Sequence, residues 1–75
     1  MPILTIGDRS IEVNQHRLIR EAVRMFVMSP AQQNYRVEAA KQKLAEWAKL
    51  PSTRANEGAA KKAAAIVLSQ GITSL

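Results

Sequence analysis

The 75-residue sequence predicts a mainly α-helical domain with a small β element: an N-terminal β-hairpin followed by three α-helices packed as a small bundle. Three observations predict this fold. β-branched residues gather before residue 14, apolar residues recur at helical spacing after it, and serine, proline and glycine separate the helical stretches. A chain of this length forms one domain, residues 1–75.

The hairpin is expected at about residues 3–13, where two apolar, β-branched runs flank the turn sequence GDRS. Gly7 and Asp8 in this turn both tolerate positive φ. A turn centred on GDRS places four apolar side chains on one face in two cross-strand pairs. These pairs are Ile6 with Ile11 and Leu4 with Val13. Because an isolated hairpin is only marginally stable in water, the apolar face is expected to pack on the helices.

The first helix is expected at about residues 15–28. Asn14 is a good N-cap, and Val13 can pack against Leu18 as a hydrophobic staple, so the helix should begin near Gln15. Six apolar residues then recur at helical spacing and are expected to face the core: Leu18, Ile19, Ala22, Val23, Phe26 and Val27.

The second helix is expected at about residues 30–50. Ser29 is its N-cap, Pro30 occupies its first turn, and Gln32 completes a capping box. Pro51 ends it. Its apolar stripe consists of Val37, Ala40, Leu44, Trp47 and Ala48.

The third helix is expected at about residues 55–70 and is less sharply bounded. Ser52 and Asn56 are its two candidate N-caps. Gly71 suits the left-handed position that ends many helices, so we expect a positive φ there.

The net charge of +5 predicts an acidic partner, and for a small basic domain this is most often nucleic acid. The excess charge is divided evenly among residues 15–28, 29–50 and 51–75, which carry +2 each. A basic surface must therefore be assembled by folding, because no single tail carries the charge.

Several function classes are not expected. The chain has no cysteine and a single histidine, His16, so a histidine or cysteine metal cluster cannot form within one chain. No catalytic triad or phosphate-cradling glycine loop stands out, and we expect a non-enzymatic protein without a cofactor. The stretch MPILTIG lacks signal-peptide features, and the longest apolar run, AAAIVL, is too short to span a membrane. A cytoplasmic protein without a membrane partner is expected.

Three groups of residues are candidate contact sites. The first is the arginine stripe of Arg17, Arg20 and Arg24, which lines up on one helix face. For this stripe a solvated helix face is the preferred explanation, and contact with phosphate or an acidic partner is the alternative. The second is the segment STRAN with the two lysines that follow it. Its residues are Ser52, Thr53, Arg54, Asn56, Lys61 and Lys62, and helix capping is the competing explanation.

The third is Tyr35 beside Arg36, an arrangement that suits base stacking or a protein contact. The alternative explanation is that the Tyr35 ring is half-buried against another element of the fold.

Two functions are compatible with this pattern. The first is a nucleic-acid-binding or nucleoprotein-associated protein that uses arginine and lysine side chains on helix faces. The alternative is an adaptor or inhibitor that docks on a larger acidic protein, with a homodimer as one arrangement. Phosphate binding weakens steeply with salt whereas apolar docking does not, so salt dependence separates the two. DNA, RNA and protein partners remain open at this point.

Overall fold

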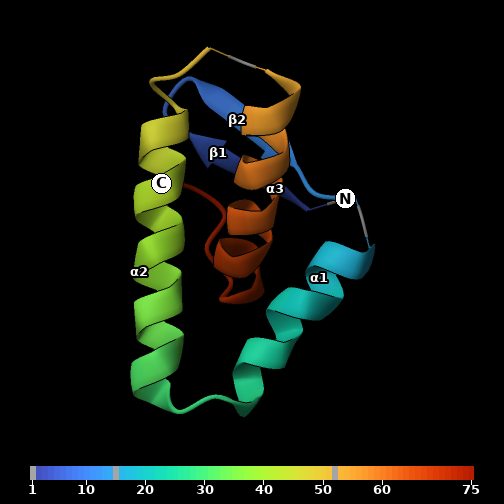
Figure 1. Cartoon of the computed structure of the whole chain (residues 1–75), viewed down its shortest axis with the longest axis vertical. Coiled ribbons are helices and arrows are strands. Elements are labelled where there is room, and N and C mark those ends of the chain that lie inside the picture. Colours follow the sequence, from blue (N-terminus) through green and yellow to red (C-terminus); the bar gives the residue numbers. More distant parts are fainter. Residues whose placement is uncertain (1, 15, 52) are drawn as a thin grey trace.

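The computed structural model describes residues 2–14, 16–51 and 53–75, and it confirms the predicted architecture (Figure 1). An N-terminal antiparallel hairpin is followed by three helices that pack together. The strands are β1 (Ile3–Ile6) and β2 (Arg9–Glu12). The helices are α1 (His16–Val23), its 3-10 continuation η1 (Arg24–Val27), α2 (Pro30–Trp47) and α3 (Arg54–Ser69).

The hairpin has a tighter register than predicted. The pairing of Ile6 with Ile11 is wrong, because the loop consists of Gly7 and Asp8 alone. Gly7 has a φ of +57° and Asp8 does not have a positive φ, a combination typical of a type II′ turn. The observed pairs are Ile3 with Glu12, Leu4 with Ile11, Thr5 with Ser10, and Ile6 with Arg9. The register differs from the prediction by an even number of residues, so the predicted apolar face is retained and is buried.

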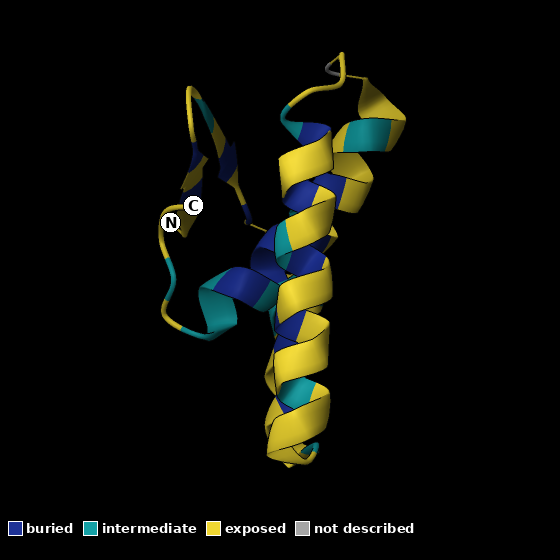
Figure 2. Ribbon diagram, turned by 90° about the vertical axis from the view of Figure 1, so that its left-hand side faces the viewer, coloured by how far each residue is buried: buried dark blue, intermediate teal, exposed yellow. Residues whose placement is uncertain are grey.

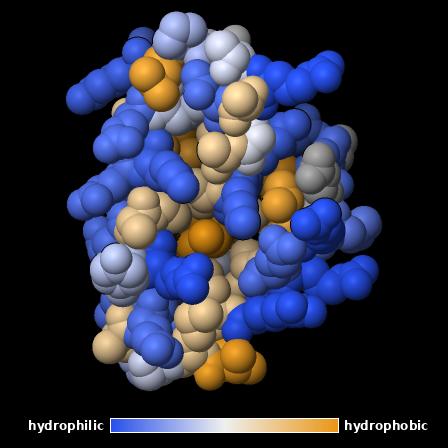
Figure 3. Space-filling view, in the orientation of Figure 1, coloured by the Kyte–Doolittle hydropathy of each residue, from blue (hydrophilic) through white to orange (hydrophobic). Residues whose placement is uncertain are grey.

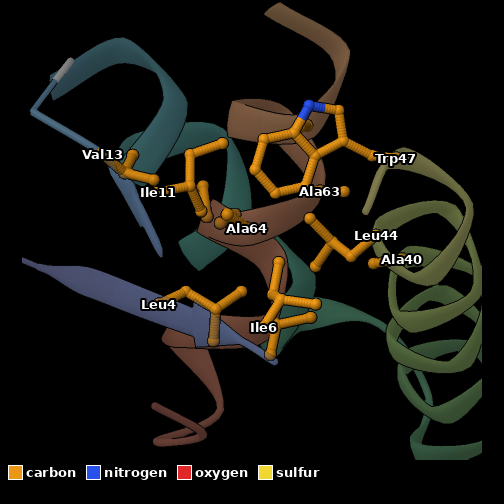
Figure 4. Packing of buried hydrophobic residues seen from close by; sticks show 13 residues of the cluster. Leu4, Ile6, Ile11, Val13, Ala40, Leu44, Trp47, Ala63 and Ala64 are labelled. Atoms are coloured by element: carbon orange, nitrogen blue, oxygen red, sulfur yellow. The ribbon is translucent and has the colours of Figure 1, made fainter. Parts of the chain in front are cut away.

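The core lies between the hairpin and the helices (Figure 4). Leu4 and Val13 from the hairpin, Leu44 from α2 and Val67 from α3 are its largest fully buried side chains. α3 is central, since it packs against α1, α2 and both strands, and its buried alanines allow this close approach. In Figure 1, α1 and η1 run down toward the start of α2 and meet it below α3.

The chain end returns to the hairpin. Gly71 has a φ of +80°, which confirms the predicted left-handed residue, and its N–H donates to the carbonyl of Leu68 (3.0 Å). The tail then lies beside β1: the N–H of Thr5 donates to the carbonyl of Thr73 (3.0 Å), and the N–H of Leu75 donates to the carbonyl of Thr5 (2.8 Å). These backbone bonds satisfy polar groups along the outer edge of β1.

The end of the first helix differs from the prediction. The α-helix stops at Val23 and continues as η1, so the expected core positions Phe26 and Val27 are 55% and 89% exposed, and Val23 is 47% exposed. A 3-10 helix has three residues per turn, which rotates the side chains after residue 23 relative to an α-helix. Met25 is buried instead.

The helix caps are confirmed in part. Ser29 Oγ accepts the N–H of Gln32 (3.3 Å) as predicted. The cap of α3 is Thr53, whose Oγ1 accepts the N–H of Asn56 (3.1 Å), so Asn56 as cap was wrong. α2 ends at Trp47, three residues before the predicted end, because residues 48–50 form a turn. The other predicted start and cap, Gln15 and Ser52, lie outside the described residues.

Candidate nucleic-acid interface

A hollow with a volume of about 490 Å³ lies between α2 and α3. A smaller hollow of about 180 Å³ adjoins it where α1 and η1 approach α3. The two are neighbours because both are lined by Arg36, Lys62 and Ile66. We call the two together the basic groove.

Four cationic side chains line the basic groove, and they come from three helical segments. Arg24 belongs to η1, Arg36 and Lys43 to α2, and Lys62 to α3. Within the described residues the only ion pairs join Arg17 to Glu21 and Lys41 to Glu38. None of the four groove cations is therefore neutralised by a carboxylate in the part of the chain that is described.

Two carboxylates also border the groove. Glu21 accepts from the Nε of Arg17 (3.3 Å), so its charge is already balanced, and Glu46 stands at the far end from Arg24. The groove consequently keeps an excess of positive charge. Positive charges that line a hollow concentrate anions there more strongly than the same charges spread over a convex surface.

The floor of the basic groove is apolar. It is formed by small side chains of α2 and α3 together with Ile66: Ala39, Ala40, Ala59 and Ala63. In Figure 3 an apolar strip runs down the middle of the face seen in Figure 1, with hydrophilic side chains on both sides. An anion can therefore contact the charged side chains at the rims of the groove, while a flat or aliphatic group packs against its apolar floor.

Tyr35 lies next to this groove. It is 75% exposed and, with Arg36 and Met28, lines a third hollow of about 380 Å³. The half-buried alternative for Tyr35 was therefore wrong, because the first turns of α2 extend beyond the hairpin and α3. An exposed aromatic ring beside a guanidinium suits stacking with a nucleobase.

The arginine stripe is divided by the structure. Arg17 pairs with Glu21 and Arg20 is exposed on α1, and neither lines the groove. Arg24 alone reaches it, because η1 follows α1 toward α3. The stripe thus has one member in the groove and two outside it.

The STRAN segment lies at the opposite end of α3 and has structural contacts. Thr53 caps the helix, and the Nδ2 of Asn56 donates to the carbonyl of Pro51 (2.9 Å). Arg54 is exposed, and Lys61 is half-buried on the same helix. Of this predicted group only Lys62 lines the groove, and Ser52 lies outside the described residues.

Lys43 is the groove residue that the sequence reasoning missed. It lies seven residues after Arg36, with Ala39 and Ala40 between them, so two turns of helix bring both cations to one side. The same spacing occurs on α3, where Ala59 and Ile66 lie seven apart with Lys62 between them. This repeated pattern of cations on an alanine face was the available signal.

Some groups are not found in the described part of the chain. No three histidine, aspartate or glutamate side chains there lie close enough to hold a metal ion. No helix within residues 2–14, 16–51 and 53–75 is long and apolar enough to cross a bilayer. Comparison of the whole chain with protein-family models, curated proteins and solved structures gives no match.

Proposed function

We propose that this protein binds single-stranded nucleic acid in the basic groove, without catalysis. The observation that carries the proposal is the convergence of four cations without carboxylate partners in the described residues, Arg24, Arg36, Lys43 and Lys62, on one hollow. Each is a donor to phosphate oxygens, and phosphate contacts supply most of the affinity of sequence-independent binding.

The apolar floor and Tyr35 favour a single strand over a duplex. A duplex presents phosphates outward and keeps its bases stacked inside, so it would leave the alanine floor and the exposed ring uncovered. A single strand can place sugars and bases on apolar surface and stack a base on tyrosine, which contributes about 1–3 kcal/mol per base.

The experiment is fluorescence anisotropy with labelled single-stranded DNA, single-stranded RNA and a DNA duplex, each at several salt concentrations. We expect both single strands to bind more tightly than the duplex, with affinity that falls as salt rises. The double variant Arg36→Gln/Lys62→Gln should flatten the slope of log affinity against log salt by about 1.4, since each phosphate contact to a single strand contributes about 0.7.

A control of equal charge change is Lys49→Gln/Arg54→Gln, because both residues are exposed and lie outside the groove. Its slope should stay within experimental error of the parent slope. If this control loses affinity while the groove variant does not, the contact surface is at the start of α3 and the groove is not the site. Absence of binding to every probe at low salt would refute the function itself.

A further inference from the structure

A second surface lies where α1 passes into η1, at the lower end of the molecule in Figure 1. Three large apolar side chains are exposed there, and we call Val23, Phe26 and Val27 the apolar corner. Val27 is 89% exposed, the highest value of any large apolar side chain in the described chain. Residues of this kind are usually buried, and contiguous exposed apolar surface on a small protein indicates a docking site.

Arginines are interleaved with these apolar side chains. Val23 follows Arg20 by three residues, and Val27 follows Arg24 by three. Residues three and four apart are neighbours on a helix, and in a 3-10 turn residues three apart are nearly eclipsed. The exposed face of α1 and η1 therefore alternates guanidinium and aliphatic groups.

The neighbouring end of α2 leaves more apolar surface uncovered. Its residues 30–36 are exposed except for Gln33, which is half-buried, and Figure 2 shows this lower part of α2 extending beyond the core. Ala31 and Tyr35, four residues apart, share a side here and line a hollow with Met28, which directly follows the corner. The uncovered surface thus extends from the corner onto α2.

We propose that the apolar corner docks an acidic amphipathic helix of another protein. Charge complementarity selects this occupant: Arg20 and Arg24 accompany the corner, and the nearest carboxylate on the helix, Glu21, is paired with Arg17. A helix with leucines on one face and glutamates beside them would bury the valines and meet the two guanidiniums. A second copy of this chain would bring arginines against arginines, and like charges across an interface oppose association.

The apolar corner borders the basic groove only at Arg24, while the adjoining surface on α2 shares Met28 with the groove. Of the corner residues only Phe26 offers a ring on which a base can stack, so nucleic acid does not explain the exposure of Val23 and Val27. The two proposals can accordingly fail independently.

The test is anisotropy of a fluorescein-labelled helical peptide with leucines at helical spacing on one face and glutamates on the other. Two control peptides accompany it: one with the same residues reordered so that the leucines share no face, and one with lysine in place of glutamate. We expect only the acidic amphipathic peptide to bind the parent protein. Val27→Ser should weaken it about tenfold, because the valine would lose its burial on binding.

Val27 is almost fully exposed, so its replacement should leave the melting temperature unchanged, which thermal unfolding checks. The matched control is Leu50→Ser, an exposed leucine at the other end of α2, which should not alter peptide binding. Lys43→Gln/Lys62→Gln, which changes the basic groove alone, should also leave peptide binding intact. Equal binding of the reordered or lysine peptide would overturn the proposal, as would an unchanged affinity in Val27→Ser. Light scattering tests the remaining alternative. If the parent protein has the mass of two chains and Val27→Ser has the mass of one, the corner binds a second copy of this chain instead.

Discussion

At the residue scale, Arg9 and Trp47 connect the hairpin to α2. The guanidinium of Arg9 donates from Nη1 to the carbonyl of Trp47 (2.9 Å) and from Nη2 to the carbonyl of Leu50 (2.8 Å). Its Cζ also lies 5.1 Å from the centre of the indole ring. Carbonyls at the end of a helix have no partner within the helix, so these bonds complete the C-terminus of α2 while the cation lies over the ring.

Arg9→Ala should therefore lower the free energy of unfolding by about 1.5–3 kcal/mol, the range for hydrogen bonds to a charged group. Arg9→Lys should recover only part of this loss, since an ammonium cannot reproduce the two-pronged geometry. Thermal unfolding measures both, with the exposed Arg54→Ala as a control that should change stability little. Equal stability of Arg9→Ala and the parent would show that these contacts do not form in solution.

Trp47→Ala should unfold or nearly unfold the protein. Trp47 is 93% buried in the core, and truncation of a buried aromatic side chain costs about 3–5 kcal/mol, against about 4–11 kcal/mol for a whole domain of this length. Trp47→Phe should be tolerated much better. Among the described residues the indole Nε1 has no hydrogen-bond partner, so phenylalanine keeps most of the apolar contact and removes an unpaired N–H. Melting curves of both variants, monitored by circular dichroism, test this order.

At the element scale, each segment is bounded by interactions within a few residues. Gly7 turns the hairpin, Ser29 and Thr53 cap α2 and α3, and Gly71 ends α3. In each case the requirement is local: a positive φ that side chains disfavour, or an N–H that the helix leaves unpaired. These requirements explain why the hairpin and the three helices occur where the sequence predicts them.

Alanine in place of Gly58, inside α3, and in place of Gly71, just after α3, should change the stability of the protein in opposite directions. Gly71→Ala should destabilise the protein by about 1 kcal/mol, because its φ of +80° is strained for any residue with a Cβ. Gly58→Ala should stabilise it by about 0.5–1 kcal/mol, since Gly58 lies inside a helix and an added Cβ would meet nothing within 4 Å. Chemical denaturation of both variants checks the signs. A stabilising Gly71→Ala would contradict the left-handed end of α3.

At the scale of the whole molecule, α3 holds the other elements in place. It contacts α1, α2 and both strands within a body of about 34 × 22 × 20 Å. Because η1 and α2 both lie beside α3, the hollows along α3 are lined by cations from η1, α2 and α3. Four of the eleven lysines and arginines of the sequence, taken from separate segments, thus line one groove.

Replacement of Arg17, Arg20 and Arg24 together by glutamine tests this arrangement. The fold should be retained, since all three side chains are exposed and glutamine has good helix propensity. Only Arg24 lines the groove, so the salt slope of single-strand binding should flatten by about 0.7, the value for one contact, and not by three times that amount. A loss equal to three contacts would show that α1 itself is the nucleic-acid surface.

Several features could be predicted from local sequence alone: the hairpin and its apolar face, the three helices, the start of α2 at Ser29 and the positive φ of Gly71. All of these depend on interactions between residues close together in the chain. For the candidate site it identified Arg24, Arg36, Lys62 and Tyr35, yet it could not separate them from Arg17, Arg54 or Lys61, since any exposed cation on an amphipathic helix has the same pattern.

Tertiary packing fixes which of these cations share a groove, because Arg24, Arg36 and Lys62 lie on three segments whose relative positions are set by contacts with α3. It also placed Arg9 over Trp47, 38 residues away. The exposure of Phe26 and Val27 was equally out of reach of local reasoning, since an α-helical continuation would have buried them. The 3-10 turn that carries Met25 into a buried position instead turns these two side chains toward solvent.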